Sequence, residues 1–401
     1  MDNMNVIKRI WCRLFQGAFR LALPLLPYRN PIILKSINEI PHLLISKKKK
    51  SILIVTDNGI IKSGLINPLL QLLKSNAFNF SVFSDVQPNP TVLNIENARK
   101  SYITQRAEAI IAIGGGSAID TAKALGARIV HPHKSLEKMG GILRVIKPLP
   151  TFIAIPTTAG TGSETTLAAI VTDPQKQRKY ALMSFPLIPH YAVLDPQMTL
   201  SLPQHLTATT GMDALTHAIE AFIGRSTTNE TRTLAIDAVK LIFSNIEKAY
   251  QNGNNLDARK NMLIASYKAG LSFSKSYVGY VHAIAHSLGG KYNIPHGLAN
   301  AVILPYVLEA YNGTVYKKLS ILAKAADIAD KDDTQKIAAE KFIAAVKTLN
   351  TNLEIPQKID AIIDEDIPIL AAHAEKEANP LYPVPLLMTA KQLEKIYHRI
   401  K

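Results

Sequence analysis

The sequence predicts an α/β domain built on a parallel sheet, followed by an all-helical domain. Between residues 31 and 200, short apolar runs alternate with helical patterns, as a parallel sheet with crossover helices requires. From residue 201 onward, Ala, Leu and Ile recur at helical spacing. A chain of 401 residues with 47% hydrophobic content can bury two cores, so we expect the division after residues 195 to 202. We expect the active site in the cleft between the two domains.

Five apolar runs are the predicted strands of the sheet. They are SILIVTD (51–57), NFSVFSD (79–85), EAIIAI (108–113), TFIAIP (151–156) and YAVLD (191–195). No internal repeat or long low-complexity linker interrupts the pattern.

A glycine turn follows the third of these runs. Gly114, Gly115 and Gly116 lead into a helical pattern that opens near Ser117. Glycine allows positive φ and close backbone approach, and the first turn of a helix presents free N–H groups to an anion. The turn lacks the GxGxxG and GxxxxGK[ST] spacings, so a purely structural turn is the alternative.

A hydroxyl-rich segment, TTAGTGSETT, follows the fourth run at residues 157–166. Its Thr157, Thr158, Thr161 and Ser163 could wrap a polar ligand. The alternative is an ordinary surface loop.

Two further segments, GMDALTHAIEA (211–221) and VHAIAHSLGGKYNIPHG (281–297), offer one carboxylate and four imidazoles. Asp213 and His217 stand four residues apart, as do His282 and His286, so each pair projects from one helix face. Gly289, Gly290 and Pro295 are expected to break the second helix and to fold His296 back toward the others. One His on a helix is more often a core or surface residue, but this grouping predicts a site for Fe²⁺ or Zn²⁺ with three His and one Asp. The fourth imidazole is then free for another role.

In their order, these motifs resemble the iron-containing (group III) alcohol dehydrogenases, in the superfamily of glycerol dehydrogenase and dehydroquinate synthase. The resemblance starts near Ile52 and runs to the C-terminus. It rests on ILIVTD (52–57), PNPT (88–91), AIGGGSAIDTAKA (112–124), PTTAGTGSE (156–164), GMDALTHAIEA and HAIAHSLGGKYNIPHGLANAVILP (282–305). It implies a Rossmann-like sheet in the first domain.

The resemblance also implies roles for individual residues. The metal ligands would be Asp213, His217, His282 and His296, with His286 unligated beside the hydride path. Gly114, Gly115, Gly116 and Ser117 would hold the pyrophosphate, with Asp120 supporting the turn. Thr157, Thr158 and Thr161 would contact the cofactor, and Lys179 would reach its nicotinamide side. Asp57 would accept a hydrogen bond from the adenosine ribose, which favours NAD over NADP.

The implied activity is hydride transfer between a primary alcohol or aldehyde and NAD(H), with the substrate oxygen on the metal. Iron is expected from the family, while zinc suits the same ligands. His286, ribose hydroxyls or waters would carry the proton. A polyol dehydrogenase on the same scaffold is the alternative, and a homodimer or higher homo-oligomer is expected.

Residues 1–30 form an extension that does not align with the family. Residues 5–27 hold four basic and no acidic residues, and the chain's only cysteine, Cys12, indicates a reducing, cytoplasmic location. Three hypotheses fit this segment: an arm on the α/β domain or a neighbouring subunit, a peripheral membrane contact, or a targeting segment.

The net charge of +15 is also typical of a different class of protein, one that binds the membrane surface or nucleic acid. The only dense basic run, Lys47 to Lys50, precedes a strand and is expected to form a solvated turn. Because no aromatic-rich basic motif accompanies it, we expect no nucleic-acid partner.

Overall fold

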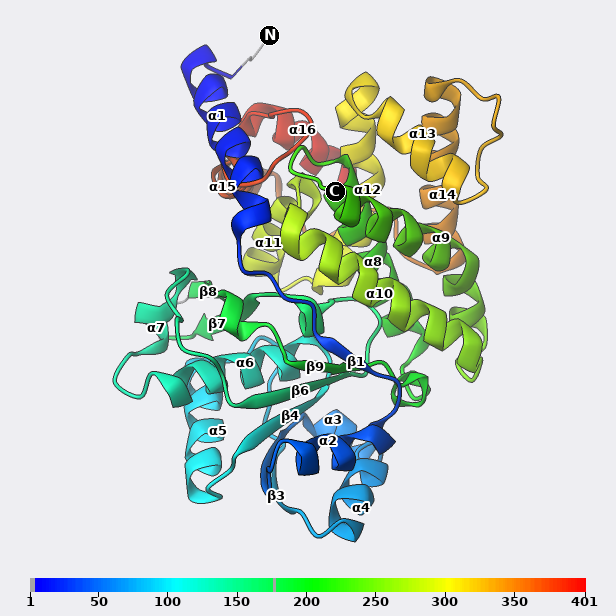
Figure 1. Cartoon of the computed structure of the whole chain (residues 1–401). Coiled ribbons are helices and arrows are strands. Elements are labelled where there is room, and N and C mark those ends of the chain that lie inside the picture. Colours follow the sequence, from blue (N-terminus) through cyan, green and yellow to red (C-terminus); the bar gives the residue numbers. More distant parts are fainter. Residues whose placement is uncertain (1–3, 176–177) are drawn as a thin grey trace. The chain divides into compact units, whose positions relative to one another are not determined.

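The computed structural model describes residues 4–175 and 178–401 and divides into two compact units (Figure 1). One unit is Pro27–Leu202, and the other joins the chain up to Leu26 with Pro203–Lys401. The first unit is α/β and the second is helical, so the predicted fold class is confirmed.

A six-stranded parallel sheet forms the centre of the α/β unit. Its strand order is β1-β9-β6-β4-β2-β3. All five predicted runs are strands, and the short β1 is an edge strand that the sequence did not predict. The bounds are β1 (Ile32–Leu34), β2 (Ser51–Val55), β3 (Asn79–Phe83), β4 (Ala109–Gly114), β6 (Thr151–Pro156) and β9 (Tyr191–Val193).

Helices cover both faces of this sheet. Along β4, Ile110 and Ala112 belong to the core that α5 and α6 complete, while Ile111 and Ile113 belong to the core that α2 and α4 complete. Since both faces are buried, the strand is apolar throughout rather than alternating. The helices are α2 (Ile40–Ser46), α3 (Asn58–Lys62), α4 (Asn67–Ser75), α5 (Val92–Thr104), α6 (Gly116–Val130) and α7 (Leu136–Met139).

A second, three-stranded sheet of order β5-β8-β7 was not predicted. Its strands are β5 (Gly141–Ile142), β7 (Ala168–Asp173) and β8 (Arg178–Met183), with β7 and β8 antiparallel. β5 is too short to show periodicity, and charged residues give β8 little apolar pattern. The Lys47–Lys50 run forms the turn before β2, as expected.

The sheet reverses its winding direction at β2. From β2 the chain first adds β3 on one side and then returns to add β4 on the other. In parallel sheets, ligands bind beyond the carboxyl ends of the strands at such a switch point. Asp57 lies just after β2, and the glycine turn begins at the end of β4.

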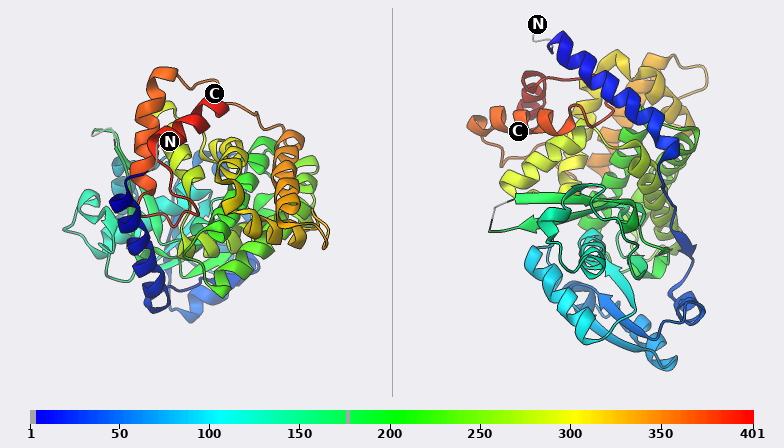
Figure 2. Two further views of the ribbon diagram at one scale, coloured as in Figure 1. Left: turned by 90° about the horizontal axis from the view of Figure 1, so that it is seen from above. Right: turned by 60° about the vertical axis from the view of Figure 1, so that its left-hand side comes forward.

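The helical unit contains nine helices after residue 203 in the described part of the chain. Figure 2 shows this predominantly helical unit from two further directions. They are α8 (Gln204–Ile223), α9 (Asn229–Gln251), α10 (Leu256–Ser276), α11 (Tyr280–Tyr292), α12 (His296–Tyr311), α13 (Tyr316–Ala325), α14 (Gln335–Asn352), α15 (Ile367–Ala378) and α16 (Ala390–Ile400). Side chains of Thr228, Asn255 and Thr389 cap the first turns of α9, α10 and α16.

The break between α11 and α12 is not where the sequence predicted it. Gly289 and Gly290 lie inside α11, which continues to Tyr292. Each glycine costs a helix only about 1 kcal/mol, which tertiary packing offsets. The turn is made instead by Asn293, which adopts the left-handed conformation at φ 56°, and by Pro295. His296 is still delivered, as the first residue of α12.

The N-terminal helix α1 (Val6–Ala22) belongs to the helical unit, not to the α/β domain on which one hypothesis placed it. The reason is that its polar anchoring contacts are made with residues of that unit. Arg13 donates to the carbonyl oxygens of Val384 and Pro385, and Gln16 donates to that of Tyr382. Within the described residues, no helix has the length and apolar character needed to cross a membrane.

Candidate metal centre and cofactor site

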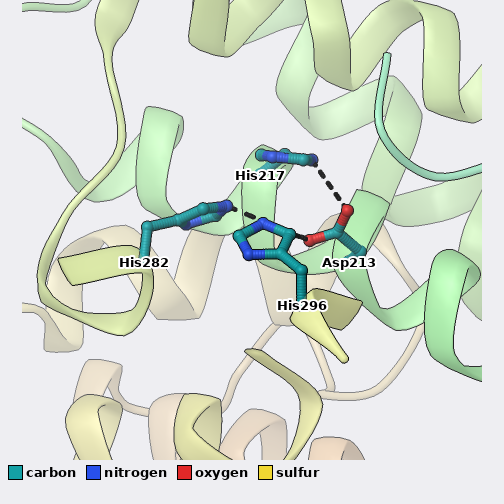
Figure 3. A group of neighbouring side chains, drawn as sticks. All are labelled: Asp213, His217, His282 and His296. Atoms are coloured by element: carbon teal, nitrogen blue, oxygen red, sulfur yellow. Dashed lines mark ion pairs between the residues drawn. The ribbon is translucent and has the colours of Figure 1, made fainter. Parts of the chain in front are cut away.

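Four side chains of the helical unit converge on one point: Asp213, His217, His282 and His296 (Figure 3). One ligand atom from each lies within 4.8 Å of all the others. Asp213 Oδ1 is 3.5 Å from His296 Nε2 and 4.0 Å from His282 Nε2. Ligand atoms at about 2.1 Å from one ion in tetrahedral geometry stand roughly 3.4 Å apart, so these spacings fit a single divalent cation.

Three helices supply this cluster. Asp213 and His217 project from α8 one turn apart, with Oδ2 and Nδ1 separated by 4.0 Å, and His282 comes from α11. α12 brings His296 close because the next residue, Gly297, packs against the backbone of α8. A Cβ on Gly297 would lie 2.5 Å from the carbonyl oxygen of Thr209.

Desolvation favours the neutral form of two imidazoles of this cluster, His282 and His296. Desolvation, reinforced by the neighbouring imidazoles, lowers the pKa of His282 well below its usual value. Desolvation also lowers the pKa of His296 to about 4, although Asp213 opposes the shift. Neutral imidazoles offer lone pairs, which a metal requires. Asp213, His217 and His282 are buried, whereas 41% of the His296 side chain is exposed, so solvent reaches the cluster there.

Glu220 orients His282, a role that the sequence interpretation missed. Its Oε2 lies 2.6 Å from His282 Nδ1, and its two oxygens also accept from the N–H groups of Gly279 and Val281 at 2.8 Å. A carboxylate on Nδ1 fixes the tautomer that turns Nε2 toward a metal. Burial raises the pKa of Glu220 to about 7, against the effect of these hydrogen bonds. Its position three residues after His217 on α8 was the available signal.

Asn300 was missed as well. Its Nδ2 is 2.7 Å from Asp213 Oδ1, 3.2 Å from His282 Nε2 and 3.1 Å from His296 Nε2. The oxygen and the two nitrogens therefore converge on the amide nitrogen of Asn300, as they would converge on a cation. Among the described residues, the buried Oδ1 of Asn300 has no hydrogen-bond partner. Asn300 stands one helical turn after His296 on α12, so helical spacing could have identified it.

His286 lies beside the cluster and outside the four-ligand group. Its ring stacks on His296 with centroids 5.2 Å apart, and its Nδ1 is 2.6 Å from Glu377 Oε1. Partial desolvation lowers the pKa of His286, but the charge of Glu377 and the hydrogen bond to it outweigh this effect and raise that pKa. Tyr382 donates to the same Glu377 oxygen at 2.7 Å. No local sequence pattern links Glu377 to His286, because they are 91 residues apart.

In the α/β unit, the glycine turn packs against the hydroxyl-rich segment. Gly114 has φ +151°, and the N–H of Thr157 donates to its carbonyl oxygen at 3.0 Å. A Cβ on Gly116 would lie 3.0 Å from Thr161 Cγ2, and one on Gly115 would lie 3.5 Å from Thr158 Cγ2. Gly115 caps α6 without a side-chain hydrogen bond, and Ser117 stands in the first turn. The predicted pyrophosphate and threonine residues therefore come together.

Asp57 stands at the same edge of the sheet. Its Oδ1 accepts from the N–H groups of Gly59 and Ile60 at 2.8 and 3.1 Å, which caps α3. Its Oδ2 would be 3.4 Å from a Cβ on Gly114. A carboxylate thus adjoins the glycine turn at the switch point.

Asp120 ties α6 to the segment that follows Thr161. It accepts from the Ser163 hydroxyl at 2.6 Å and from the N–H of Ile170 at 3.0 Å. The next turn carries Lys123, which the sequence interpretation did not single out. Its buried ammonium donates to Ser163 Oγ at 3.2 Å and to Thr166 Oγ1 at 2.8 Å. Both side chains therefore hold the hydroxyl-rich segment on the glycine-turn helix.

Lys179 lies on β8, and its ammonium donates to Asn89 Oδ1 at 3.0 Å. Asn89 belongs to the PNPT motif, so two parts of the resemblance meet here. Desolvation lowers the pKa of Lys179.

Two family profiles match the chain in succession. The profile described as iron-containing alcohol dehydrogenase matches residues 32–196, and that described as Fe-containing alcohol dehydrogenase family, C-terminal, matches residues 207–401. The matches define the class of protein as an oxidoreductase with an alcohol dehydrogenase fold. The chain belongs to the iron-containing alcohol dehydrogenase family.

Individual relatives agree with this assignment. The 1,3-propanediol dehydrogenase of Klebsiella pneumoniae is 36% identical over 371 residues, covering 90% of this chain and 93% of the relative. The NAD-dependent methanol dehydrogenase of Bacillus methanolicus is 35% identical, covering 81% of this chain and 86% of the relative. A crystal structure of 1,3-propanediol oxidoreductase superposes with a TM-score of 0.90 at 33% identity, covering 93% and 99% of the two chains.

Proposed function

We propose that this protein is an NAD-dependent alcohol dehydrogenase that interconverts short primary alcohols or terminal diols and their aldehydes at an iron centre. The observation that carries the proposal is the convergence of Asp213, His217, His282 and His296 within 4.8 Å. The family and the relatives' activities on propanediol and methanol support the substrate class.

The proposed metal ion would be held by these four side chains. When bound, it supplies Lewis-acid polarisation of the alcohol or carbonyl oxygen, and nicotinamide accepts or returns the hydride. Three imidazoles and one carboxylate suit Fe²⁺ and Zn²⁺ alike, and the family favours iron. By holding Nδ1 of His282, Glu220 would keep its Nε2 directed at the ion.

The proposed NAD site is the switch-point edge of the α/β unit. Gly114, Gly115, Gly116 and Ser117 would receive the pyrophosphate at the N-terminus of α6. Thr157, Thr158 and Thr161 surround this turn, and Asp57 would accept from the ribose 2′-OH and repel a 2′-phosphate. Asp120 and Lys123 hold the surrounding segment in place, and Lys179 is proposed for the nicotinamide side.

His286 is the proposed proton carrier. It lies beside His296 but is not one of the four ligands, and 41% of its side chain is exposed to solvent. Its hydrogen bond to Glu377 leaves the other ring nitrogen to exchange a proton with a substrate hydroxyl or water.

The test is anaerobic purification, elemental analysis, and absorbance at 340 nm with NAD⁺ and a panel of methanol, 1-propanol, 1-butanol, 1,3-propanediol and glycerol. We expect about one metal per chain, with Fe²⁺ restoring turnover to the chelated protein. Asp213→Ala and His282→Ala should lose both metal and activity.

His205→Ala is the matched control, because His205 is exposed on α8, the helix that carries Asp213 and His217. It should keep both metal and activity. Stoichiometric metal without turnover on any member of the panel would contradict the substrate class and leave the metal site standing. Preferential turnover of glycerol would instead identify a polyol dehydrogenase.

A further inference from the structure

Helix α1 presents its apolar side to solvent. Val6, Ile7, Ile10, Trp11, Leu14 and Leu21 are each more than half exposed, from 53% at Ile10 to 80% at Leu21. From Val6 to Leu14 these positions recur at three- or four-residue spacing, and Leu21 lies two helical turns beyond Leu14, so all six share one side of the helix. We call this set, with Leu25 just beyond the helix, the α1 stripe. Leu25 is 86% exposed.

The opposite side of α1 holds the helix on its unit. Cys12 and Gln16 are buried, and Gln16 with Arg13 donates to backbone carbonyls of residues 380–385. Phe19 packs edge-on against Tyr277 with ring centroids 5.0 Å apart. Most amphipathic helices of globular proteins turn their apolar face inward. Here the polar face is the anchor, so a large apolar surface stays available for a partner.

The α1 stripe lies outside the common enzyme scaffold. The two family profiles begin at residue 32 and end at residue 401, so α1 precedes both matched ranges. None of the proposed metal or cofactor residues is on α1. The residues of the proposed reaction therefore do not account for the exposed apolar surface of α1.

The charges on α1 itself are of one sign, and the one acidic side chain paired with them among the described residues is Glu375, which binds Lys8. Lys8, Arg9, Arg13 and Arg20 are on α1, and Arg9 and Arg20 are exposed. No acidic residue occurs between residues 4 and 38. A second copy of this chain would bring the same arginines and a net charge of +15, with no carboxylate on its α1 to pair with them. An anionic surface complements these charges.

We propose that the α1 stripe docks the protein peripherally on an anionic lipid bilayer. The aliphatic side chains and Trp11 would enter the boundary between headgroups and acyl chains, and Arg9 and Arg20 would contact lipid phosphates. Helix α1 would lie in the plane of the membrane. The docking is peripheral and leaves the folded units in water.

The test uses the full-length protein and Trp11, the only tryptophan of the chain. On mixed phosphatidylglycerol and phosphatidylcholine vesicles we expect a blue shift of Trp emission, quenching by brominated acyl chains, and co-sedimentation that weakens with added salt. Vesicles of phosphatidylcholine alone should bind at least tenfold more weakly. The double variant Leu14→Glu/Leu21→Glu keeps Trp11 and should lose at least tenfold in vesicle affinity while its alcohol dehydrogenase activity is unchanged.

The matched control is Ile321→Glu/Ile337→Glu. It adds the same charges at exposed apolar positions of α13 and α14, which are 42% and 44% exposed. It should bind vesicles like the parent protein. Equal loss in both double variants would mean that net charge alone governs binding, which overturns the role of the stripe. An absent shift of Trp emission would also overturn it. A parent protein that does not bind vesicles but forms a dimer, which only Leu14→Glu/Leu21→Glu dissociates, would overturn it too, because the partner of the stripe would then be a second copy of the chain.

Discussion

Glu220 controls the direction in which His282 points. The carboxylate receives the Nδ1 side of the ring at 2.6 Å and is itself fixed by two backbone N–H groups. A Cβ on Gly279 would lie 2.7 Å from Glu220 Oε1, so only glycine permits this approach. The orientation of His282 is therefore set before any ion binds.

The substitution Glu220→Gln keeps the shape of this side chain and removes its charge. Because the amide orients the imidazole less firmly, we expect affinity for the divalent ion to fall about 10- to 100-fold. Competition with a chelator measures this without reference to activity. Glu340→Gln, on the exposed side of α14, is the control and should change nothing. Unaltered metal affinity in Glu220→Gln would rule out the orienting role.

Asp57 caps α3 and is proposed to contact the cofactor ribose, and substitution can separate these two roles. Asp57→Asn retains an oxygen for the Gly59 and Ile60 N–H groups, whereas Asp57→Ala loses both the cap and the charge. Both variants should raise kcat/KM for NADP⁺ relative to NAD⁺ by about 10- to 100-fold, the value of a charged hydrogen bond. Only Asp57→Ala should also lose about 1 kcal/mol of stability through the cap. An unchanged cofactor ratio in Asp57→Asn would contradict the proposed ribose contact.

Glu164 makes stability depend on pH. Burial raises the pKa of Glu164 to about 7, partly opposed by its backbone hydrogen bond and by Lys123, from an ordinary value of 4.5. The folded protein thus binds the Glu164 proton more tightly than the unfolded chain does. The contribution of this group to the free energy of unfolding is fully present below pH 4.5 and is lost as the pH rises through 7. The side chain in Glu164→Gln stays neutral at every pH. The free energy of unfolding of this variant, relative to that of the parent, should therefore rise by up to about 3 kcal/mol between pH 4.5 and 8.

Urea denaturation at several pH values measures that difference. Glu365→Gln, at an exposed position, should track the parent at every pH. A difference in the free energy of unfolding that stays constant over the whole pH range would contradict the prediction, because ionisation of Glu164 would then not destabilise the folded protein.

At the scale of elements, α12 must approach α8 closely enough to deliver His296. Gly297→Ala would place its Cβ 2.5 Å from the Thr209 carbonyl oxygen and push the two helices apart. We expect at least a tenfold loss of metal affinity, with the helix content by circular dichroism retained. Gly290→Ala is the matched control, because no atom lies within 4 Å of its Cβ. It should be neutral or add about 1 kcal/mol to stability. Retained metal affinity in Gly297→Ala would show that α12 can shift without losing the site.

Sequence periodicity predicted the elements wherever one pattern dominates. The five buried runs became strands, and the i, i+4 spacing of Asp213 and His217 survived as one face of α8. Periodicity failed where packing decides. Gly289 and Gly290 stayed helical because the cost of a glycine is small, and α1 turned its apolar side outward because Arg13 and Gln16 anchor it.

The same contrast holds within the site. Glu220 and Asn300 lie one helical turn from proposed ligands, so extending the spacing argument would have found both. Glu377 and Lys123 could not be found that way. Their contacts, to His286 and to Ser163, join segments 91 and 40 residues apart in the sequence.

At the scale of the whole molecule, the proposed metal ion and the proposed NAD are bound by residues of different units. All four proposed metal-binding side chains come from the helical unit, and all proposed cofactor residues come from Pro27–Leu202.

A ligand stabilises the structure that binds it by RT ln(1 + [L]/Kd), about 2.7 kcal/mol at a hundredfold excess over Kd. Hydrogen exchange should therefore quicken in α8, α11 and α12 when a chelator removes the metal, with α6 unaffected. NAD⁺ added to the chelated protein should slow exchange at the start of α6 and leave α8 unchanged. Protection by metal that spread equally over β2, β4 and α6 would instead show that the cation binds elsewhere or stabilises both units together.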